Sequence, residues 1–247
     1  MSEERVRERT DAEEGQLVMP FYLICDVSGS MSRDMPDLND GVRRLRRAII
    51  AEPVVDDVAQ VCIMTFSDVA KVVMPMTQMS EHEVPTLSVE GGTDYGAAFR
   101  ALAQTIAKDT ATLKAQGYKV YRPCAFFLTD GLPNDRDWHH TFTSTLTYDR
   151  ATSSGMKGHP IFVPFGFRSA SVEVLKQLAY PPERGRWYHM KTSNVEEALK
   201  GILDVIMNTV ITSGQSVHTG QPAVTPQSPA PGSGIDHGAS EYDPDYV

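Results

Sequence analysis

Apolar runs and amphipathic stretches alternate along residues 17–212 of this chain. Residues 19–25 and 124–129 are short, apolar and rich in strand-forming side chains, so each run predicts a buried β-strand. Apolar residues recur at helical spacing over 38–49 and 95–116, which predicts two amphipathic helices. Such alternation is typical of an α/β fold.

Two further strand-like runs, residues 60–66 and 69–74, are separated only by Ser67 and Asp68, which predicts a hairpin and one antiparallel edge strand. The remaining predicted elements are strands at 160–165 and 187–190 and helices at 138–153, 171–179 and 195–211. Together they predict a Rossmann-like, doubly wound, mostly parallel sheet with helices on both faces. In such sheets ligands bind beyond the carboxyl ends of the strands, where the strand order reverses.

The two ends of the chain differ in composition from the domain predicted over residues 17–212. Residues 1–16 alternate acidic and basic side chains without an apolar face, which predicts a flexible, solvated arm. Residues 213–247 are rich in proline and glycine and contain no lysine or arginine, which predicts a disordered acidic tail. The acidic, tyrosine-bearing end of this tail is interpreted either as a docking peptide or as a solubilising segment.

The net charge and the distribution of apolar residues argue against two classes of function, nucleic-acid binding and membrane spanning. The chain has 247 residues, of which 41% are hydrophobic, with 23 basic and 32 acidic side chains and a formal net charge of −9. This balance argues against nucleic-acid binding, which needs clustered lysine and arginine. No apolar stretch approaches the roughly 20 residues that cross a bilayer, and the charged first residues do not resemble a signal peptide. We therefore expect a cytoplasmic protein without membrane contact.

The cysteines predict no metal site and no disulfide framework. Cys25, Cys62 and Cys124 each lie in an apolar, strand-like run, and no C-x-x-C pair is present. We expect three reduced thiols in the core.

Polar residues concentrate at three places that follow or connect the predicted strands. DVSGS at 26–30 follows the first strand, GGTD at 91–94 precedes the long helix, and TDG at 129–131 spans the end of a central strand. If the strands at 19–25 and 124–129 are neighbours, all three clusters converge on the same edge of the sheet.

These clusters supply only oxygen ligands. The carboxylates of Asp26 and Asp130 and the hydroxyls of Ser28, Ser30 and Thr93 form a set that suits hard cations such as Mg²⁺ or Mn²⁺. Hydroxyls coordinate without adding charge, so a bound ion keeps a positive field that attracts an outside carboxylate. The simpler alternative is that these residues only form turns and cap helices.

Other candidate residues have structural interpretations beside functional ones. Asp94 is interpreted as the N-cap of the long helix rather than as a ligand. His139 and His140 are adjacent and therefore point in different directions, so we expect a solvated pair rather than a zinc site. Trp138, on a rim loop near the predicted cation, is a candidate partner-binding residue, and packing against the domain is the alternative.

The motifs DVSGSMS, GGT and LTDG, in this order on an alternating α/β chain, resemble the metal-ion-dependent adhesion site (MIDAS) of von Willebrand factor A (vWA) domains. The resemblance implies that Asp26, Ser28, Ser30, Thr93 and Asp130 are ligands of Mg²⁺ or Mn²⁺. It also implies a protein-binding module in which an acidic side chain of the partner completes the coordination.

A narrower resemblance rests on FYLICDVSGSM, IMTFSD, GGTDYGAAFRAL and YRPCAFFLTDGLPND, which are similar to bacterial TerY-type proteins associated with tellurium resistance. It implies a cytoplasmic protein that works with a protein phosphatase or a kinase-like protein in stress or phosphorylation signalling. Some relatives carry a Cys-rich, zinc-binding C-terminal segment, and the tail of this chain has no cysteine, so that accessory function is not supported.

Two other functions remain as alternatives. Other intracellular A domains serve as adaptors for AAA-type ATPases, and this chain is a candidate for that role. A strand-terminal aspartate with Mg²⁺ also suggests phosphoryl transfer, but phosphatases of that design resemble DxDx[TV], and Ser28 stands in place of the second acid. Neither a phosphate-binding loop nor a nucleophile elbow is present. We therefore predict a binding protein and no enzyme.

Overall fold

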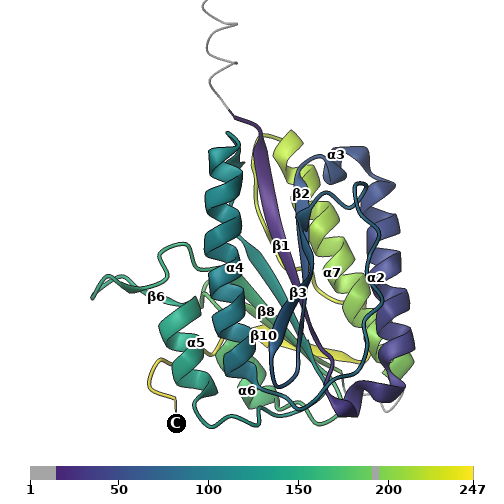
Figure 1. The fold of residues 1–247 in the computed structure, drawn as a ribbon, viewed down its shortest axis with the longest axis vertical. Coiled ribbons are helices and arrows are strands. Elements are labelled where there is room, and N and C mark those ends of the chain that lie inside the picture. Colours follow the sequence, from purple (N-terminus) through teal and green to yellow (C-terminus); the bar gives the residue numbers. More distant parts are fainter. Residues whose placement is uncertain (1–14, 191–194, 247) are drawn as a thin grey trace, which may run out of the picture.

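The computed structural model describes residues 15–190 and 195–246, and the arm predicted over residues 1–16 lies almost entirely outside them (Figure 1). The main sheet has the strand order β10-β9-β8-β5-β1-β2-β3, and β4 pairs with the start of β1. Its strands are β1 (Leu17–Asp26), β2 (Ala59–Phe66), β3 (Ala70–Thr77), β4 (Lys119–Val120), β5 (Cys124–Thr129), β8 (Ile161–Gly166), β9 (Arg186–Met190) and β10 (Ile235–Ala239). A separate small pair is formed by β6 (Tyr148–Asp149) and β7 (Ser154–Gly155).

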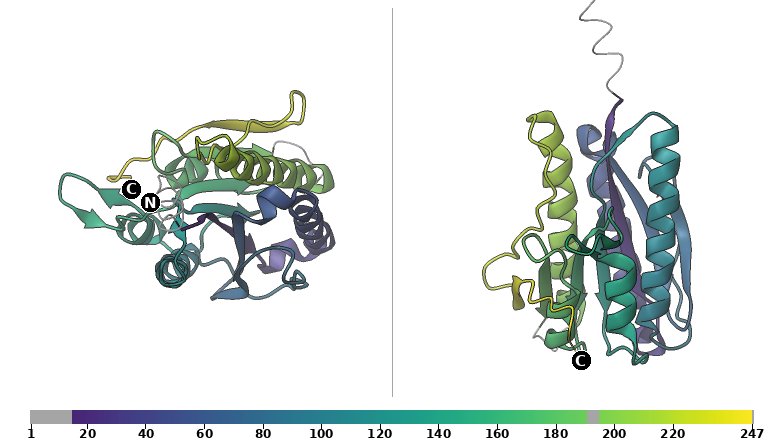
Figure 2. Two further views of the ribbon diagram at one scale, coloured as in Figure 1. Left: turned by 90° about the horizontal axis from the view of Figure 1, so that it is seen from above. Right: turned by 90° about the vertical axis from the view of Figure 1, so that its left-hand side faces the viewer.

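Helices cover both faces of this sheet (Figures 1 and 2). The helical elements are η1 (Gly29–Arg33, a 3₁₀ turn), α2 (Met35–Ile50), α3 (Pro53–Asp56), α4 (Tyr95–Ala115), α5 (Trp138–Leu146), α6 (Val172–Leu178) and α7 (Val195–His218). Apolar residues of α2, α3 and α7 pack on one face, and those of α4 and α5 pack on the other. Both faces of the central strands are therefore shielded from water.

Strand β1 shows how this two-sided core follows from the sequence. Successive side chains of a strand point to opposite faces. Phe21, Leu23 and Cys25 accordingly join the cluster with α2 and α7, whereas Tyr22 and Ile24 join the cluster with α4 and α5. A strand covered on both sides needs a continuous apolar run rather than an alternating one, as the sequence of β1 provides.

The predicted fold class is confirmed. Strand β1 runs parallel to both β2 and β5, β5 runs parallel to β8, and the hairpin predicted between β2 and β3 is antiparallel. The helix predicted over residues 138–153 ends earlier, at Leu146, because the backbone turns extended at Thr147 (φ −110°, ψ 171°) and continues into the β6–β7 pair. The last helix, predicted to end at residue 211, continues to His218.

The segment predicted as a disordered tail is packed against the domain in this structure. Residues 213–218 continue α7, and β10 pairs antiparallel with β9. The sheet therefore has a second antiparallel edge strand in addition to the predicted one. The composition of the segment indicated too few apolar residues to form a core of its own. The segment instead attaches to the core of the domain, through backbone pairing of β10 with β9 and through the aromatic rings of Tyr242 and Tyr246.

Two further expectations concern the core and the surface. Cys25, Cys62 and Cys124 are free and buried, as predicted. Within residues 15–190 and 195–246, none of the helices combines the length and the hydrophobicity that crossing a bilayer requires.

Phe99 is the centre of the aromatic cluster beneath α4, and its loss is expected to destabilise the domain strongly. Its buried ring lies 5.1 Å from Phe142, 5.6 Å from Phe127 and 5.8 Å from Phe162 between ring centroids. Phe99→Ala should lower the free energy of unfolding by about 3–5 kcal/mol, measured by urea denaturation. Val72→Ala, at a side chain 45% exposed, is the control and should change it by less than about 0.5 kcal/mol. Equal effects of the two changes would contradict this assignment of the core.

Candidate metal centre

The candidate site lies where two neighbouring parallel strands end. Cys25 of β1 pairs with Leu128 of β5, so Asp26, at the last position of β1, and Asp130, just past the end of β5, lie at the same edge of the sheet. From β1 the chain passes through α2 and α3 to β2, on one side of β1, and after β3 it passes through α4 and β4 to β5, on the other side of β1. The strand order therefore reverses at β1, which is the position where sheets of this kind bind ligands.

The loop after β1 folds tightly around its own aspartate. The backbone N–H of Ser28 donates to Asp26 Oδ1 at 2.8 Å, which closes a turn two residues long. The chain then enters the 3₁₀ turn η1, and the fully buried Met31 anchors this turn in the core. This geometry holds the Ser28 and Ser30 hydroxyls beside each other, with the two oxygens 3.0 Å apart.

Four of the five predicted ligands form one hydrogen-bonded cluster. Ser30 Oγ donates to Asp130 Oδ1 at 2.7 Å, and Ser30 Oγ is in turn hydrogen-bonded to Ser28 Oγ. Asp26 is linked to Ser28 through the backbone N–H described above, and its Oδ2 accepts from Thr129 Oγ1 at 2.8 Å. Residues about one hundred positions apart in the chain are therefore in contact.

The fifth predicted ligand, Thr93, lies on the loop before α4, and hydrogen bonds tie this loop to the loops that follow β1 and β5. Gly29 N–H donates to Gly91 O at 3.1 Å, and Asn134 N–H donates to Thr93 O at 2.9 Å. In the described part of the chain, no hydrogen bond joins the Thr93 hydroxyl to the other predicted ligands. Gly91 has φ +35°, and a Cβ there would collide with the carboxylate of Asp68, so this loop requires glycine at that position.

The two carboxylates of the cluster are both removed from water. Asp26 and Asp130 are 0% and 1% exposed. Burial raises the pKa of Asp26 to about 6, hydrogen bonds from Ser28 and Thr129 oppose that shift, and the charge of Asp130 adds to it. Among residues 15–190 and 195–246, no lysine or arginine forms an ion pair with either carboxylate. Asp130 Oδ2 is buried and has no hydrogen-bond partner in that part of the chain.

This donor set fits a divalent cation. Two adjacent buried acids without a cationic side chain are unfavourable unless a positive charge joins them. The described residues contain no group of three or more His, Cys, Asp and Glu side chains that could hold a metal. The candidate centre combines two acids with hydroxyls instead, a mixture that suits hard, oxygen-binding ions.

Sequence reasoning did not identify several residues that support the cluster. Tyr95 OH donates to Thr129 Oγ1 at 3.1 Å and to Gly131 O at 2.9 Å, so the tyrosine ring braces the end of β5. Asp135 accepts the N–H groups of Tyr95 and Gly96 at 2.9 and 3.0 Å, which ties the loop after β5 to the start of α4. Thr129 lies within a motif that the sequence displays, but nothing in the sequence distinguishes Tyr95 from a core residue.

Asp94 is the N-cap of α4, as predicted, because its Oδ1 accepts from Ala97 N–H at 2.6 Å.

The loop after β8 also contacts the cluster, because both the N–H and the hydroxyl of Ser169 donate to Asp130 O. The neighbouring Arg168 pairs with the buried Asp34 at 2.6 Å. The loop after β8 therefore fixes the backbone of Asp130.

Trp138, the candidate partner-binding residue, is buried in this structure. Its side chain is 9% exposed, and its ring lies 6.1 Å from that of Tyr246 in the C-terminal segment. The structure therefore shows Trp138 packed against the domain and the C-terminal segment, and its role in binding a partner stays a prediction. The prediction of a solvated histidine pair is confirmed for His140, which is exposed, and wrong for His139, which is buried between the rings of Trp138 and Tyr242.

Residues 21–132, a little under half of the chain, match the von Willebrand factor type A domain model, and this range includes the three motifs on which the predicted resemblance rests. No curated protein sequence gives a match.

Several solved structures share the fold. Proximal thread matrix protein 1 of the mussel byssus, with a zinc-occupied MIDAS motif, is 14% identical with a TM-score of 0.53, over 80% of this chain and 49% of that chain. The ArnB paralog VWA2 from Sulfolobus acidocaldarius is 14% identical with a TM-score of 0.50, over 81% and 46%. The pilus adhesin SpaC from Lactobacillus rhamnosus GG, in an open conformation, is 15% identical with a TM-score of 0.54, over 79% and 30%. These similarities establish the fold alone, and the chain spans less than half of each of these proteins.

The buried carboxylate of Asp26 is expected to cost stability in metal-free buffer. Its pKa rises from 3.8 to about 6 on folding, so the native state holds a proton that the unfolded chain releases between these pH values. Stability from this group therefore falls as pH rises through that range and is lowest above it. Asp26→Asn should raise the unfolding free energy at neutral pH by about 1–3 kcal/mol, measured in EDTA.

The control for this measurement is Asp137→Asn, which removes an exposed carboxylate from the neighbouring loop and should leave stability unchanged. An Asp26→Asn variant that is less stable than the wild type in EDTA at neutral pH would show that burial of this carboxylate carries no such cost.

Proposed function

We propose that this protein is a divalent-cation-dependent protein-binding module. Asp26, Ser28, Ser30, Thr93 and Asp130 would hold the cation, and Mg²⁺ or Mn²⁺ is the ion that this all-oxygen set suits best. When bound, the ion supplies a positive charge at the rim of the sheet to which a carboxylate of the partner binds.

One observation carries this proposal: Asp26 and Asp130 are buried side by side, and Asp130 Oδ2 has no hydrogen-bond partner in the described residues. Turn formation alone does not account for a buried carboxylate oxygen without a hydrogen-bond partner, because buried polar atoms are normally paired. The hydroxyls of Ser28 and Ser30 add donor atoms without charge, so the ion retains a net positive field.

The comparisons support the same proposal. The mussel protein with this fold has zinc in its MIDAS motif, and SpaC is a pilus adhesin. The resemblance to TerY-type proteins points to a cytoplasmic role in stress response or tellurite resistance, with a protein phosphatase or a kinase-like protein as the partner.

No specific observation favours the alternatives of an ATPase adaptor or a phosphoryl-transfer enzyme. Asp26 accepts hydrogen bonds through both of its oxygens, from Ser28 N–H and Thr129 Oγ1. This arrangement restrains the carboxylate and suits a ligand better than a nucleophile.

The isolated protein should bind Mg²⁺ weakly, with a dissociation constant on the order of 0.1–1 mM, because only two of its proposed ligands are charged. At ten times that concentration the cation should stabilise the fold by about 1–2 kcal/mol and raise Tm by about 3–6 °C, measured by calorimetry. Asp130→Ala should abolish the shift, and the control Asp137→Ala should retain it. A shift that survives in Asp130→Ala would place the cation elsewhere.

Partner binding should depend on the same ion. Wild type, Asp130→Ala and Asp137→Ala are each used to capture proteins from native extract in Mg²⁺ and in EDTA, and the captured proteins are identified by mass spectrometry. We expect a phosphatase or kinase-like protein with wild type and Asp137→Ala in Mg²⁺ only. Identical captures under all conditions would refute metal-bridged recognition.

A further inference from the structure

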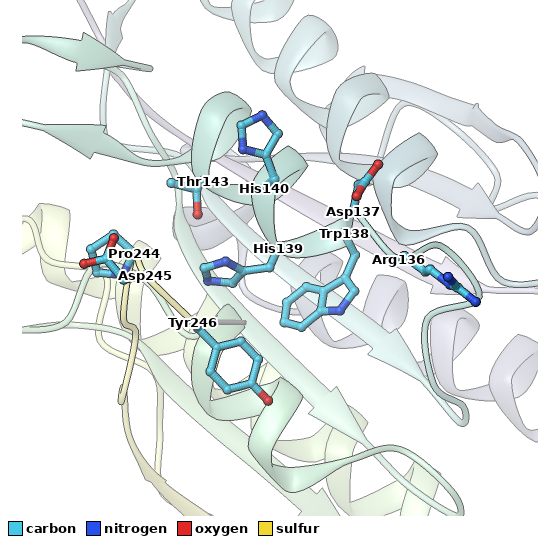
Figure 3. A pocket seen from close by; sticks show the side chains of 9 residues that line it. All are labelled: Arg136, Asp137, Trp138, His139, His140, Thr143, Pro244, Asp245 and Tyr246. Atoms are coloured by element: carbon cyan, nitrogen blue, oxygen red, sulfur yellow. The ribbon is translucent and has the colours of Figure 1, made fainter.

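Residues 240–246, here called the tail peptide, lie across the surface formed by α5 and α6. The side chains of this α5–α6 surface that contact the tail peptide are Trp138, His139, Phe142, Thr143, Lys176, Gln177 and Tyr180. Figure 3 shows one end of this contact, where the rings of Trp138, His139 and Tyr246 lie close together.

Gln177 recognises the backbone of the tail peptide. Its side chain is 8% exposed, its Nε2 donates to Glu241 O at 2.8 Å, and its Oε1 accepts from Asp243 N–H at 2.7 Å. The main-chain O of Lys176 accepts from Glu241 N–H at 3.2 Å. One amide that bonds the C=O of a residue and the N–H two positions later recognises an extended segment independently of its side chains.

Two tyrosines supply the side-chain contacts. The Tyr242 ring lies 5.1 Å from that of Tyr180, and its hydroxyl is hydrogen-bonded to Thr143 Oγ1 at 3.2 Å. The Tyr246 ring lies 5.4 Å from His139. Tyrosines anchored in this way are typical of the side chains that dominate binding energy at interfaces.

Charge favours an acidic segment on this surface. Lys176 Nζ lies 3.0 Å from Glu241 Oε1. Arg136 and Asp137 both line the pocket that Asp245 also lines, and Figure 3 shows the Arg136 side chain turned away from Asp245. The charge complementarity therefore rests on Lys176, which pairs with an acid at the start of the tail peptide.

The tail peptide fits this surface incompletely. His139 Nε2 is buried and has no hydrogen-bond partner in the described residues. A pocket of about 390 Å³ remains between Trp138 and Tyr246, and another of about 560 Å³ lies between Tyr242 and Tyr148. An occupant that filled this space and paired His139 would bind more tightly than the tail peptide does.

We propose that the α5–α6 surface is a second protein-binding site, for an extended acidic segment of a partner with tyrosines four residues apart, and that the tail peptide occupies it in cis. The tail peptide competes from within the same chain, at an effective concentration that is on the order of millimolar for such linked segments. A partner must therefore displace it.

The test uses the full chain and a fluorescein-labelled synthetic peptide with the sequence of residues 240–247. Tyr242→Ala/Tyr246→Ala removes the anchors of the tail peptide but leaves the α5–α6 surface intact. This double variant should bind the labelled peptide with a dissociation constant of about 1–100 μM, measured by fluorescence anisotropy. Wild type should bind at least about tenfold more weakly, because its surface is occupied.

Two controls separate recognition from misfolding. Tyr118→Ala removes a tyrosine between α4 and β4 that is not among the residues contacting the tail peptide, so this variant should behave like wild type. Gln177→Glu, added to the double variant, should abolish binding, because the substitution replaces the amide that donates to the peptide carbonyl with an acid. Urea denaturation of each variant verifies that it is folded. Hydrogen exchange of residues 240–246 should become at least about tenfold faster in the double variant, as expected for release.

Three results would overturn the proposal. They are equal peptide binding by wild type and the double variant, no binding by a folded double variant, and unchanged hydrogen exchange of the tail peptide. Dimerisation of the wild type through exchange of tails, detected by ultracentrifugation, would assign the surface to a second copy of the chain instead. None of these results depends on the cation, so failure here leaves the proposed metal-dependent function untouched.

Discussion

The burial of Asp26 and Asp130 at the ends of adjoining strands is the constraint on which the site depends. Parallel pairing of β1 with β5 sets the two acids at one edge, and neighbouring loops close over them. Buried like charges disfavour the native state, and the surrounding hydroxyls and backbone N–H groups offset only part of that cost. The fold therefore holds two buried acids that no lysine or arginine of residues 15–190 and 195–246 pairs with, at a cost that the rest of the structure must offset.

The rest of the fold supplies the stability that this arrangement requires. Strand β1 is covered on one face by α2 and α7 and on the other by α4 and α5. Tyr95 serves both purposes, because its ring packs against Phe127 in the core and its hydroxyl braces Thr129 beside Asp26. The aromatic core and the polar rim are therefore one continuous structure, and loosening the ring cluster would move a side chain that positions the acids.

Local patterns in the sequence were sufficient to predict much of this structure. Continuous apolar runs identified β1 and β5, helical spacing identified α4, and the short Ser67-Asp68 connection identified the hairpin. These features depend on near neighbours in the chain. The cluster of Asp26, Ser28, Ser30 and Asp130 was predictable for a related reason: strand ends at a reversal of strand order must meet.

The features that the sequence did not reveal depend on contacts between distant segments. From the sequence, Tyr95 is indistinguishable from a core residue, because its neighbours in the chain do not indicate that its hydroxyl is hydrogen-bonded at the end of β5. The C-terminal segment has the composition of a disordered chain. Composition does not reveal that the domain offers this segment the edge of β9 for pairing and the buried Gln177 for binding its backbone. Segments of this kind acquire structure from the surface that receives them, so their order is a property of the surface as much as of their own residues.

The candidate cation site and the α5–α6 surface are joined by the loop that leads from Asp130 to Trp138. This loop is not a free hinge, because Asp135 accepts two N–H groups at the start of α4 and Asn134 N–H is bonded to Thr93 O. Energetic coupling between sites requires an element with two arrangements, and a loop fixed in this way favours one. The two proposed sites are therefore best understood as separate surfaces on a common frame, one proposed to select a carboxylate through an ion and the other proposed to select an extended backbone through an amide.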